Sequence, residues 1–266
     1  MLERIPEQEI VMVSRDSVEA FDRAGLERGP LFPIYHVNST GYSRHLPPGA
    51  VVVDLFCGPA RFISYLLQGR PDVSAIGIDL SSKMLDLAAE NLRSAGLADR
   101  VRLIQGDGAS ASELVQDPVH GVSCLSALHH CPSMTHLVEV LGEIRKFHDR
   151  GAAVWLFDLV RPDTEETVKF IPAMHEVSQA TKLPAAFKED WMNSLRAGWT
   201  FDEFKTAMGR AGISLHSSQA NYSQLHWAPS PNREELYNVP WARRALTSQE
   251  EKRMAKLKEL LRFDST

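Results

Sequence analysis

Disulfide frameworks, membrane spans and secretion signals are all missing from this sequence. Its 266 residues include only three cysteines, at positions 57, 124 and 131, and their spacing shows no pairing. No segment reaches the roughly 18 uninterrupted apolar residues of a membrane span. The first residues also lack the basic and then apolar pattern of a signal peptide. We therefore expect a reduced, cytoplasmic protein with no membrane partner.

A net positive charge is missing as well. The formal net charge is -5 at pH 7 and the pI is about 6.1, so no broad positive field is available to attract a nucleic acid. The sequence contains neither an internal repeat nor a low-complexity tract. Its hydrophobic fraction of 44% is enough for a substantial core, and its length fits one large domain, or one core domain with additions.

The most informative stretch covers residues 51–62. A run of β-branched residues predicts a buried strand, which ends at Asp54 and passes through a tight turn into a helix. In an open α/β sheet, ligands bind at this end of a strand, against the helix N-terminus, and an Asp there suits a cationic group. The turn holds one glycine, Gly58, so the dinucleotide fingerprint G-x-G-x-x-G is absent. Together with the lack of a Tyr-x-x-x-Lys pair, this sets aside an NAD-dependent reductase.

Strands and helices alternate along the middle of the chain. The patterns predict strands over 51–55, 73–78, 101–104, 122–126 and 152–157, and helices over 61–68, 81–95 and 135–149. This order indicates a parallel sheet with helices on both faces. Beyond it we expect two helices over 162–197 with a break at Leu183-Pro184, a helix over 201–211 capped by Thr200, and two last strands over 213–218 and 222–227.

Three regions follow from this pattern. Residues 1–48 form an N-terminal helical extension or lid, with a helix over 17–27 that Ser17 caps. Residues 49–228 form the core domain, with a helical insert at about 162–199. Residues 229–266 form a C-terminal helical extension, in which Ser248-x-x-Glu251 is a capping-box signature for a charged helix over 248–262.

Four short motifs, in order, resemble those of the class I S-adenosylmethionine (SAM) methyltransferases. Asp54-Leu55-Phe56-Cys57-Gly58 resembles the first motif, D-x-G-x-G-x-G, and Asp79-Leu80-Ser81-Ser82-Lys83-Met84-Leu85 resembles the second, D-x-S-x-x-M-L. The stretch 101–109, with Asp107, is similar to the third, and 124–130 is similar to the fourth. The resemblance implies a Rossmann-like, seven-stranded, mostly parallel sheet that ends in an antiparallel hairpin.

The resemblance also implies which residues hold the cofactor SAM. Asp79 would accept hydrogen bonds from both ribose hydroxyls, Met84 would pack on adenine, and Asp107 would accept from the adenine amine. The full set of predicted cofactor residues is Asp54, Phe56, Cys57, Gly58, Pro59, Asp79, Leu80, Met84, Asp107, Gly108, Ala109 and Ser126. Phe56 and Ala60 stand where the first motif usually has glycine. A D-x-F-x-G form occurs in the cytosine-C5 DNA methyltransferases, and the Phe56 ring would then pack beside the cofactor.

Methyl transfer is an in-line displacement that needs alignment and exclusion of water, and a base only where the nucleophile carries a proton. His129 and His130 follow the fourth strand and are the candidate bases, because imidazole titrates near neutrality. Packing against the sheet and helix capping are the alternative roles. We expect no metal, because adjacent residues such as His129, His130 and Cys131 rarely point at one ion.

Three further residues are candidates for the substrate pocket. Asp158 and Arg161 follow the fifth strand, and an Arg there suits a carboxylate or phosphate. Tyr35 lies in the aromatic part of the N-terminal segment. The alternatives are an ion pair that anchors the turn at Arg161-Pro162, and aromatic docking of the segment onto the core.

Motif comparison narrows the methyl acceptor. Cytosine-C5 enzymes use a Pro-Cys dipeptide where this chain has Cys131-Pro132, and exocyclic amino methylation uses an Asp/Asn-Pro-Pro-aromatic motif that residues 126–129 do not match. A small-molecule acceptor with an O, N or S nucleophile remains. The alternative is a non-catalytic SAM-fold protein that acts as a partner or scaffold through its charged C-terminal helix. The oligomeric state is left open, a homodimer included.

Overall fold

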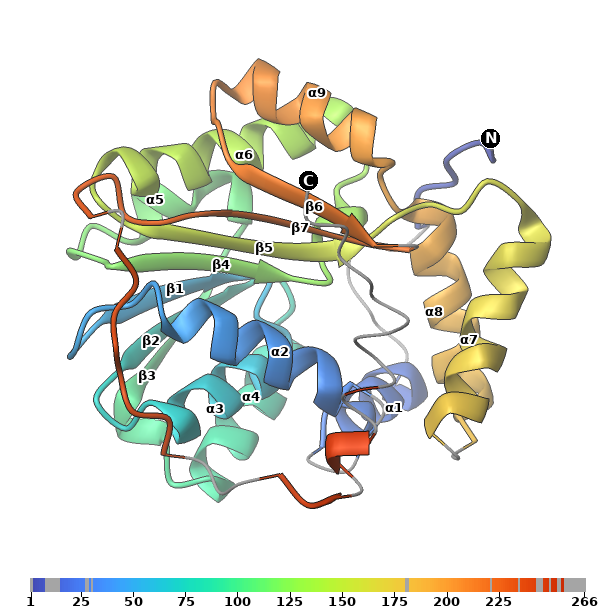
Figure 1. Ribbon diagram of the computed structural model, residues 1–266, viewed down its shortest axis with the longest axis horizontal. Helices are drawn as coiled ribbons and strands as arrows, with labels where there is room; N and C mark the ends of the chain where they lie inside the picture. The colour runs from blue at the N-terminus through green and yellow to red at the C-terminus, as the bar shows by residue number, and fades with distance from the viewer. Residues whose placement is uncertain are drawn as a thin grey trace.

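The computed structural model describes residues 2–7, 15–26, 29, 31–179, 182–220, 222–233, 235–242, 246–248, 250–252 and 255. A seven-stranded sheet runs through the middle, in the order β3-β2-β1-β4-β5-β7-β6 (Figure 1). Its strands are β1 (Val51–Leu55), β2 (Ser74–Asp79), β3 (Val101–Gln105), β4 (Gly121–Leu125), β5 (Ala153–Leu159), β6 (His216–Ala220) and β7 (Ser223–Ala228).

The first five strands are parallel, and β7 pairs antiparallel with both β5 and β6. This confirms the Rossmann-like sheet with a terminal antiparallel hairpin. The chain builds outward from β1 through β2 to β3 and then crosses back to place β4 on the other side of β1. Ligands of open α/β sheets bind where the strand order reverses in this way, beyond the carboxyl ends of the strands. The site is therefore expected at the tips of β1 and β4.

Helices cover both faces of the sheet, each over its own apolar core (Figure 1). One face carries α2 (Phe32–Ser43), α3 (Arg61–Gly69) and α4 (Ser82–Ser94), and the other carries α5 (Ala111–Leu114), α6 (Met134–Asp149) and α9 (Phe201–Ala211). Short 3-10 turns lie at η1 (Ala98–Arg100), η2 (Gly108–Ser110) and η3 (Leu128–His130). Within the described part of the chain, none of the helices combines the length and apolarity needed to cross a bilayer.

A third cluster of helices lies beyond the carboxyl ends of the strands. It consists of α1 (Arg15–Ala24), α7 (Glu165–Gln179) and α8 (Ala185–Ala197), which share an apolar core with Leu159 at the end of β5. Helices α7 and α8 are the two predicted after the fifth strand, with the break before Pro184. Because α1 comes from the N-terminal extension and α8 from the helical insert of the core domain, this cluster brings distant segments to the strand tips.

Several predicted boundaries were wrong. Helix α9 begins after its predicted cap Thr200, which forms a capping box with Glu203. Gly212 closes the helix in a left-handed conformation and Ile213 then packs in the core, so β6 starts at His216 instead of 213. Helix α1 starts at Arg15, and the Ser17 side chain lies outside the described residues. The C-terminal capping box pairs Thr247 with Glu250, one residue earlier than predicted. Most of the helix predicted over 248–262 also lies outside the described residues.

Helix α2 was not predicted as a helix. Its sequence has β-branched and aromatic residues and a weak apolar stripe, and Pro33 marks its first turn, where proline fits. Tertiary packing decides its structure: Tyr42 is fully buried, and Trp155 of β5 donates a hydrogen bond from Nε1 to Oδ1 of Asn38 at 2.9 Å. Gly41 allows this approach, because a Cβ added there would lie 2.6 Å from Cη2 of Trp155.

We expect Gly41→Ala to lower the free energy of unfolding by about 1–3 kcal/mol, because a methyl group would be forced against a buried indole. The matched control is Gly142→Ala in α6, where an added Cβ meets no atom within 4 Å; it should gain about 0.5–1 kcal/mol from the lost flexibility of glycine. Urea unfolding of both variants measures the difference. Equal stability of the two variants would contradict the close packing of α2 on β5.

Candidate active site

The turn after β1 is tied to the tip of β2. Cys57 donates its backbone N–H to the Ile78 carbonyl at 3.0 Å, and Gly58 donates to Oδ2 of Asp79 at 2.8 Å. The other carboxylate oxygen of Asp79 accepts from the backbone N–H of Ser81 at 2.8 Å. Asp79 therefore holds the loops after β1 and β2 together, and its oxygens have further lone pairs for a ligand.

Three non-glycine residues with positive φ surround this turn. Phe56 has φ 55°, Ala60 has φ 56° and Ser126 has φ 50°, alongside Gly58 at φ 51°. Such conformations cost on the order of 1–3 kcal/mol each and cluster at functional sites. Phe56 and Ala60 thus adopt the left-handed backbone conformation that favours glycine, the usual residue at these two positions of the related motif. The Phe56 ring packs on Gly108, where an added Cβ would lie 2.8 Å from ring atoms.

A pocket opens at these strand ends, which we call the strand-tip pocket. It holds about 920 Å³ of space open to solvent. All the predicted cofactor residues line it except Gly108 and Ala109, which form η2 behind Asp107. Asp107 accepts from the Ala109 N–H at 2.9 Å, and Nε2 of His136 lies 3.4 Å from the same carboxylate oxygen. The pattern analysis did not point to His136, which lines the pocket from the first turn of α6.

Asp54 is the most buried acid of the strand-tip pocket. Burial raises its pKa to about 7, even though Ser123 Oγ donates to its carboxyl at 2.6 Å; the neighbouring charge of Asp79 adds to the rise. Near neutral pH the free protein therefore holds this carboxyl close to half ionised. A bound cationic group would stabilise the ionised form and lower the pKa.

A second pocket, which we call the apolar pocket, adjoins the first. Its walls are mainly the side chains of Leu31, Ile34, Leu159, Phe187 and Trp191. Leu31 precedes α2 and Ile34 lies in it, Leu159 ends β5, and the other two lie in α8. Tyr35, Ser126 and His130 line both pockets. Burial raises the pKa of the Tyr35 hydroxyl well above its ordinary value, so this phenol stays neutral. The two pockets therefore meet along one short boundary.

The two adjacent histidines have different environments. His129 is buried and lies with Nδ1 2.6 Å from Oδ1 of Asp158, and its backbone N–H donates to the other Asp158 oxygen at 2.8 Å. Burial alone would lower the pKa of His129, but Asp158 outweighs it and the pKa rises. His130 is partly exposed at the boundary of the pockets, with Nδ1 2.6 Å from Oε2 of Glu7. His130 is therefore the histidine that can meet a ligand in both pockets.

The other predicted substrate residues have structural partners. Asp158 holds His129, as described above. Arg161 is buried, donates to the carbonyls of Leu2 and Gly198, and pairs with Glu203 at 2.7 Å. Among the described residues, neither Asp158 nor Arg161 lines the strand-tip or the apolar pocket.

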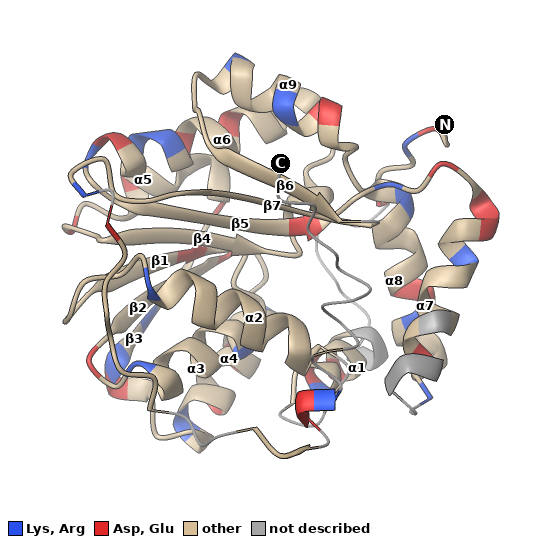
Figure 2. Ribbon diagram, in the orientation of Figure 1, with Lys and Arg blue, Asp and Glu red and all other residues tan. Residues whose placement is uncertain are grey.

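Figure 2 shows acidic and basic positions interspersed along the outer helices α6, α7 and α9.

Residues 52–151 match the family described as "Methyltransferase domain". Two curated relatives are similar over shorter stretches. A U6 snRNA (guanine-N(2))-methyltransferase from Bos taurus is 40% identical over 57 residues, 21% of this chain and 11% of its own. A ubiquinone biosynthesis O-methyltransferase from Methylococcus capsulatus is 31% identical over 98 residues, 37% of this chain and 40% of its own.

Among solved structures, an O-methyltransferase family protein from Burkholderia thailandensis superposes with a TM-score of 0.60 at 16% identity, over 82% of this chain and 62% of that one. The chain thus spans less than two thirds of each of these three proteins. At this identity the superposition shows the fold, and the family match covers the strand tips of β1 to β4. Sequence match and fold agree: residues 52–151 match a methyltransferase domain, within a seven-stranded sheet that has the fold of the superposed structure.

Proposed function

We propose that this protein transfers a methyl group from SAM to the hydroxyl oxygen of a small, largely apolar molecule. The observation that carries the proposal is the position of His130, which lines both the strand-tip pocket and the apolar pocket. An acceptor hydroxyl carries a proton at neutral pH, so its attack is helped by a base at this boundary. Two of the similar proteins are O-methyltransferases, which supports an oxygen acceptor.

The strand-tip pocket fits SAM by the chemistry of its residues. Asp79 offers carboxylate lone pairs to ribose hydroxyls, Met84 offers an apolar surface to adenine, and Asp107 offers an acceptor to its amine. Asp54 is suited to the ammonium group because a cation would ionise its carboxyl. SAM supplies an electrophilic methyl group, and the residues of the chain align this group with the acceptor.

The apolar pocket fits the acceptor. Its aliphatic and aromatic walls favour a flat hydrocarbon body and exclude water from the reacting hydroxyl. His130 would take the hydroxyl proton as the oxygen bonds to the methyl carbon, the carbon–sulfur bond of SAM breaks and S-adenosylhomocysteine leaves. Ser126 and Tyr35 line the same boundary. His129 is suited to a structural role in η3, because its raised pKa and its buried partner Asp158 keep it from serving as a free base.

We expect His130→Ala to lower turnover by about 100-fold or more, the usual size of general-base catalysis, while SAM still binds. Transfer of tritiated methyl from SAM to 1-naphthol measures it, with 1-naphthylamine, 1-thionaphthol and an RNA hairpin as comparison acceptors. His216→Ala, at an exposed histidine that lines neither pocket, is the control. Methylation of the RNA alone, or full turnover in His130→Ala, would overturn the proposed acceptor or the proposed base. A chain that does not bind SAM would favour the scaffold alternative.

Asp79→Asn should weaken binding of S-adenosylhomocysteine by about 10- to 100-fold, because charge-assisted hydrogen bonds to ribose are lost. The amide keeps one acceptor oxygen for the backbone and limits the disturbance of the two loops. Isothermal titration calorimetry measures the dissociation constant, with Asp99→Asn, an exposed acid, as the matched control. Unchanged affinity in Asp79→Asn would contradict the ribose assignment.

Cofactor affinity should fall as pH drops below about 7, the pKa of Asp54 in the free protein. The sign follows from the raised pKa: the carboxyl is protonated and neutral below this value, and only its ionised form pairs with the ammonium group. The loss approaches about tenfold per pH unit. Calorimetry with S-adenosylhomocysteine between pH 5.5 and 8.5 tests it, and Asp54→Asn should flatten the profile. The same slope in wild type and Asp54→Asn would assign the effect to another group.

A further inference from the structure

The N-terminal segment 2–7 is packed into the site by one arginine. Arg4 donates from Nε to the Ala197 carbonyl at 2.8 Å, and from Nη2 to the carbonyls of His129 and Cys131 at 2.9 and 2.7 Å. Its guanidinium also lies 3.6 Å above the Trp199 ring. These contacts join the end of α8 to η3, the turn that carries both histidines. The segment is thereby held beside the boundary of the two pockets.

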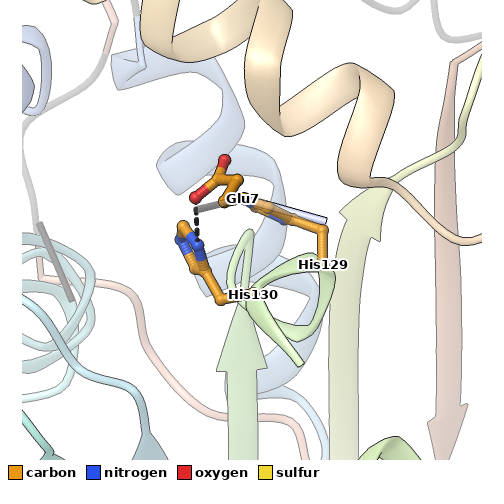
Figure 3. A group of neighbouring side chains, drawn as sticks. All are labelled: Glu7, His129 and His130. Atoms are coloured by element: carbon orange, nitrogen blue, oxygen red, sulfur yellow. Dashed lines mark ion pairs between the residues drawn. The ribbon is translucent and has the colours of Figure 1, made fainter. Parts of the chain in front are cut away.

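Glu7 is held at both carboxylate oxygens. Oε2 lies 2.6 Å from Nδ1 of His130, and Oε1 accepts from Oγ of Ser194 in α8 at 2.8 Å. Figure 3 shows the Glu7 carboxylate directed at the His130 ring, with His129 alongside. Burial pushes the pKa of Glu7 upward, but the hydrogen bond and charge of His130 outweigh it, and the pKa falls to about 2. Glu7 is therefore a carboxylate across the working pH range.

A carboxylate at Nδ1 fixes the protonation of the imidazole. The nitrogen facing Glu7 keeps its proton, and Nε2 is left as the acceptor. The same carboxylate stabilises the imidazolium that forms when Nε2 takes a proton. Arg4 anchors the segment through backbone carbonyls that do not involve position 7.

We propose that Glu7 is a positioning residue for methyl transfer: it orients His130 and stabilises its protonated form, so that the N-terminal segment completes the active site. This inference rests on the proposed function of His130 as the base.

A metal ion is the competing role for this cluster. Ligand atoms of Glu7, His129 and His130 all lie within 4.8 Å of one another. However, two ligands bound at about 2.0–2.1 Å in a tetrahedral zinc site lie roughly 3.4 Å apart. The 2.6 Å between Oε2 of Glu7 and Nδ1 of His130 is instead the distance of a direct ion pair. The geometry therefore favours the pair over the ion.

The test compares Glu7→Gln with Glu3→Gln in the 266-residue chain. Both changes remove one carboxylate from the same segment, and Glu3 is exposed. With 1-naphthol and SAM, we expect kcat of Glu7→Gln to fall by about 10- to 100-fold, the range for a lost charge-assisted hydrogen bond. The affinity for S-adenosylhomocysteine and the KM for 1-naphthol should stay within about twofold. Glu3→Gln should match wild type, and Glu7→Asp should restore part of the activity.

The pH profile separates positioning from a merely structural role. The groups that face His130 are Glu7 from the N-terminal segment, His129 in η3 and Asp79 at the tip of β2, with Arg4 beyond His129. Without the Glu7 carboxylate, a positive charge on the His130 ring loses its neighbour of opposite sign. The pH profile of kcat/KM should therefore differ from that of wild type in Glu7→Gln and match it in Glu3→Gln.

Four results would overturn the inference. Glu7→Gln could keep full kcat, or lose activity equally at every pH, which would leave Glu7 a structural role. EDTA could abolish wild-type turnover and Zn²⁺ restore it, which would make Glu7 a metal ligand. In these three cases the proposed methyl transfer to a small-molecule hydroxyl stands, since wild type still methylates 1-naphthol. Full turnover in His130→Ala would remove the proposed base, and the role of Glu7 with it.

Discussion

The site depends on the hydrogen bonds that hold the turn after β1 against the tip of β2. The Cys57 and Gly58 N–H groups are bound by Ile78 and Asp79, and this lets Phe56 and Ala60 keep left-handed conformations that cost free energy. The N-terminus of α3 is placed at the strand-tip pocket by the same turn. The acid that would contact ribose is thus also the acid that maintains the turn. Affinity and local stability are coupled at Asp79.

The two histidines after β4 show how environment separates the roles of identical side chains. His129 and His130 lie with their ring centroids 4.2 Å apart, yet His129 pairs with the buried Asp158 and lines the apolar pocket alone, whereas His130 lines both pockets. Asp158 comes from the neighbouring strand β5 and Glu7 from the N-terminal segment. Each carboxylate lies beside Nδ1 of one imidazole. The buried pair of His129 and Asp158 holds η3 in place. In the partly exposed pair of Glu7 and His130, the imidazole remains able to take a proton.

Features encoded by a few neighbouring residues could be predicted from the sequence, whereas features that depend on contacts between distant residues could not. Apolar strand runs and the acids that end them are written over a few residues, so β1 to β5 and the acids at 54, 79 and 107 could be placed. Helix α2 could not, because its packing depends on Trp155, more than a hundred residues away. Glu7 carries no local signal, and its partners His130 and Ser194 are equally remote. The shift of β6 arises from Gly212 and the burial of Ile213, which a strand pattern does not register.

This division has a physical consequence for the two pockets. The strand-tip pocket is built mainly from short motifs at successive strand ends, and the family match covers its lining except Phe21 and Tyr35. The apolar pocket is built mainly from residues of α1, α2 and α8 and of the segment before α2, which lie outside that match, together with Leu159 of β5 and with four residues inside the match: Leu125, Ser126, His129 and His130. Changes in those helices can reshape the proposed acceptor pocket while the turn at Asp79 is kept. Because Arg4 links the end of α8 to η3 from outside the matched region, such changes can also move His130, the proposed base, so the proposed acceptor pocket and base are connected through the N-terminal segment.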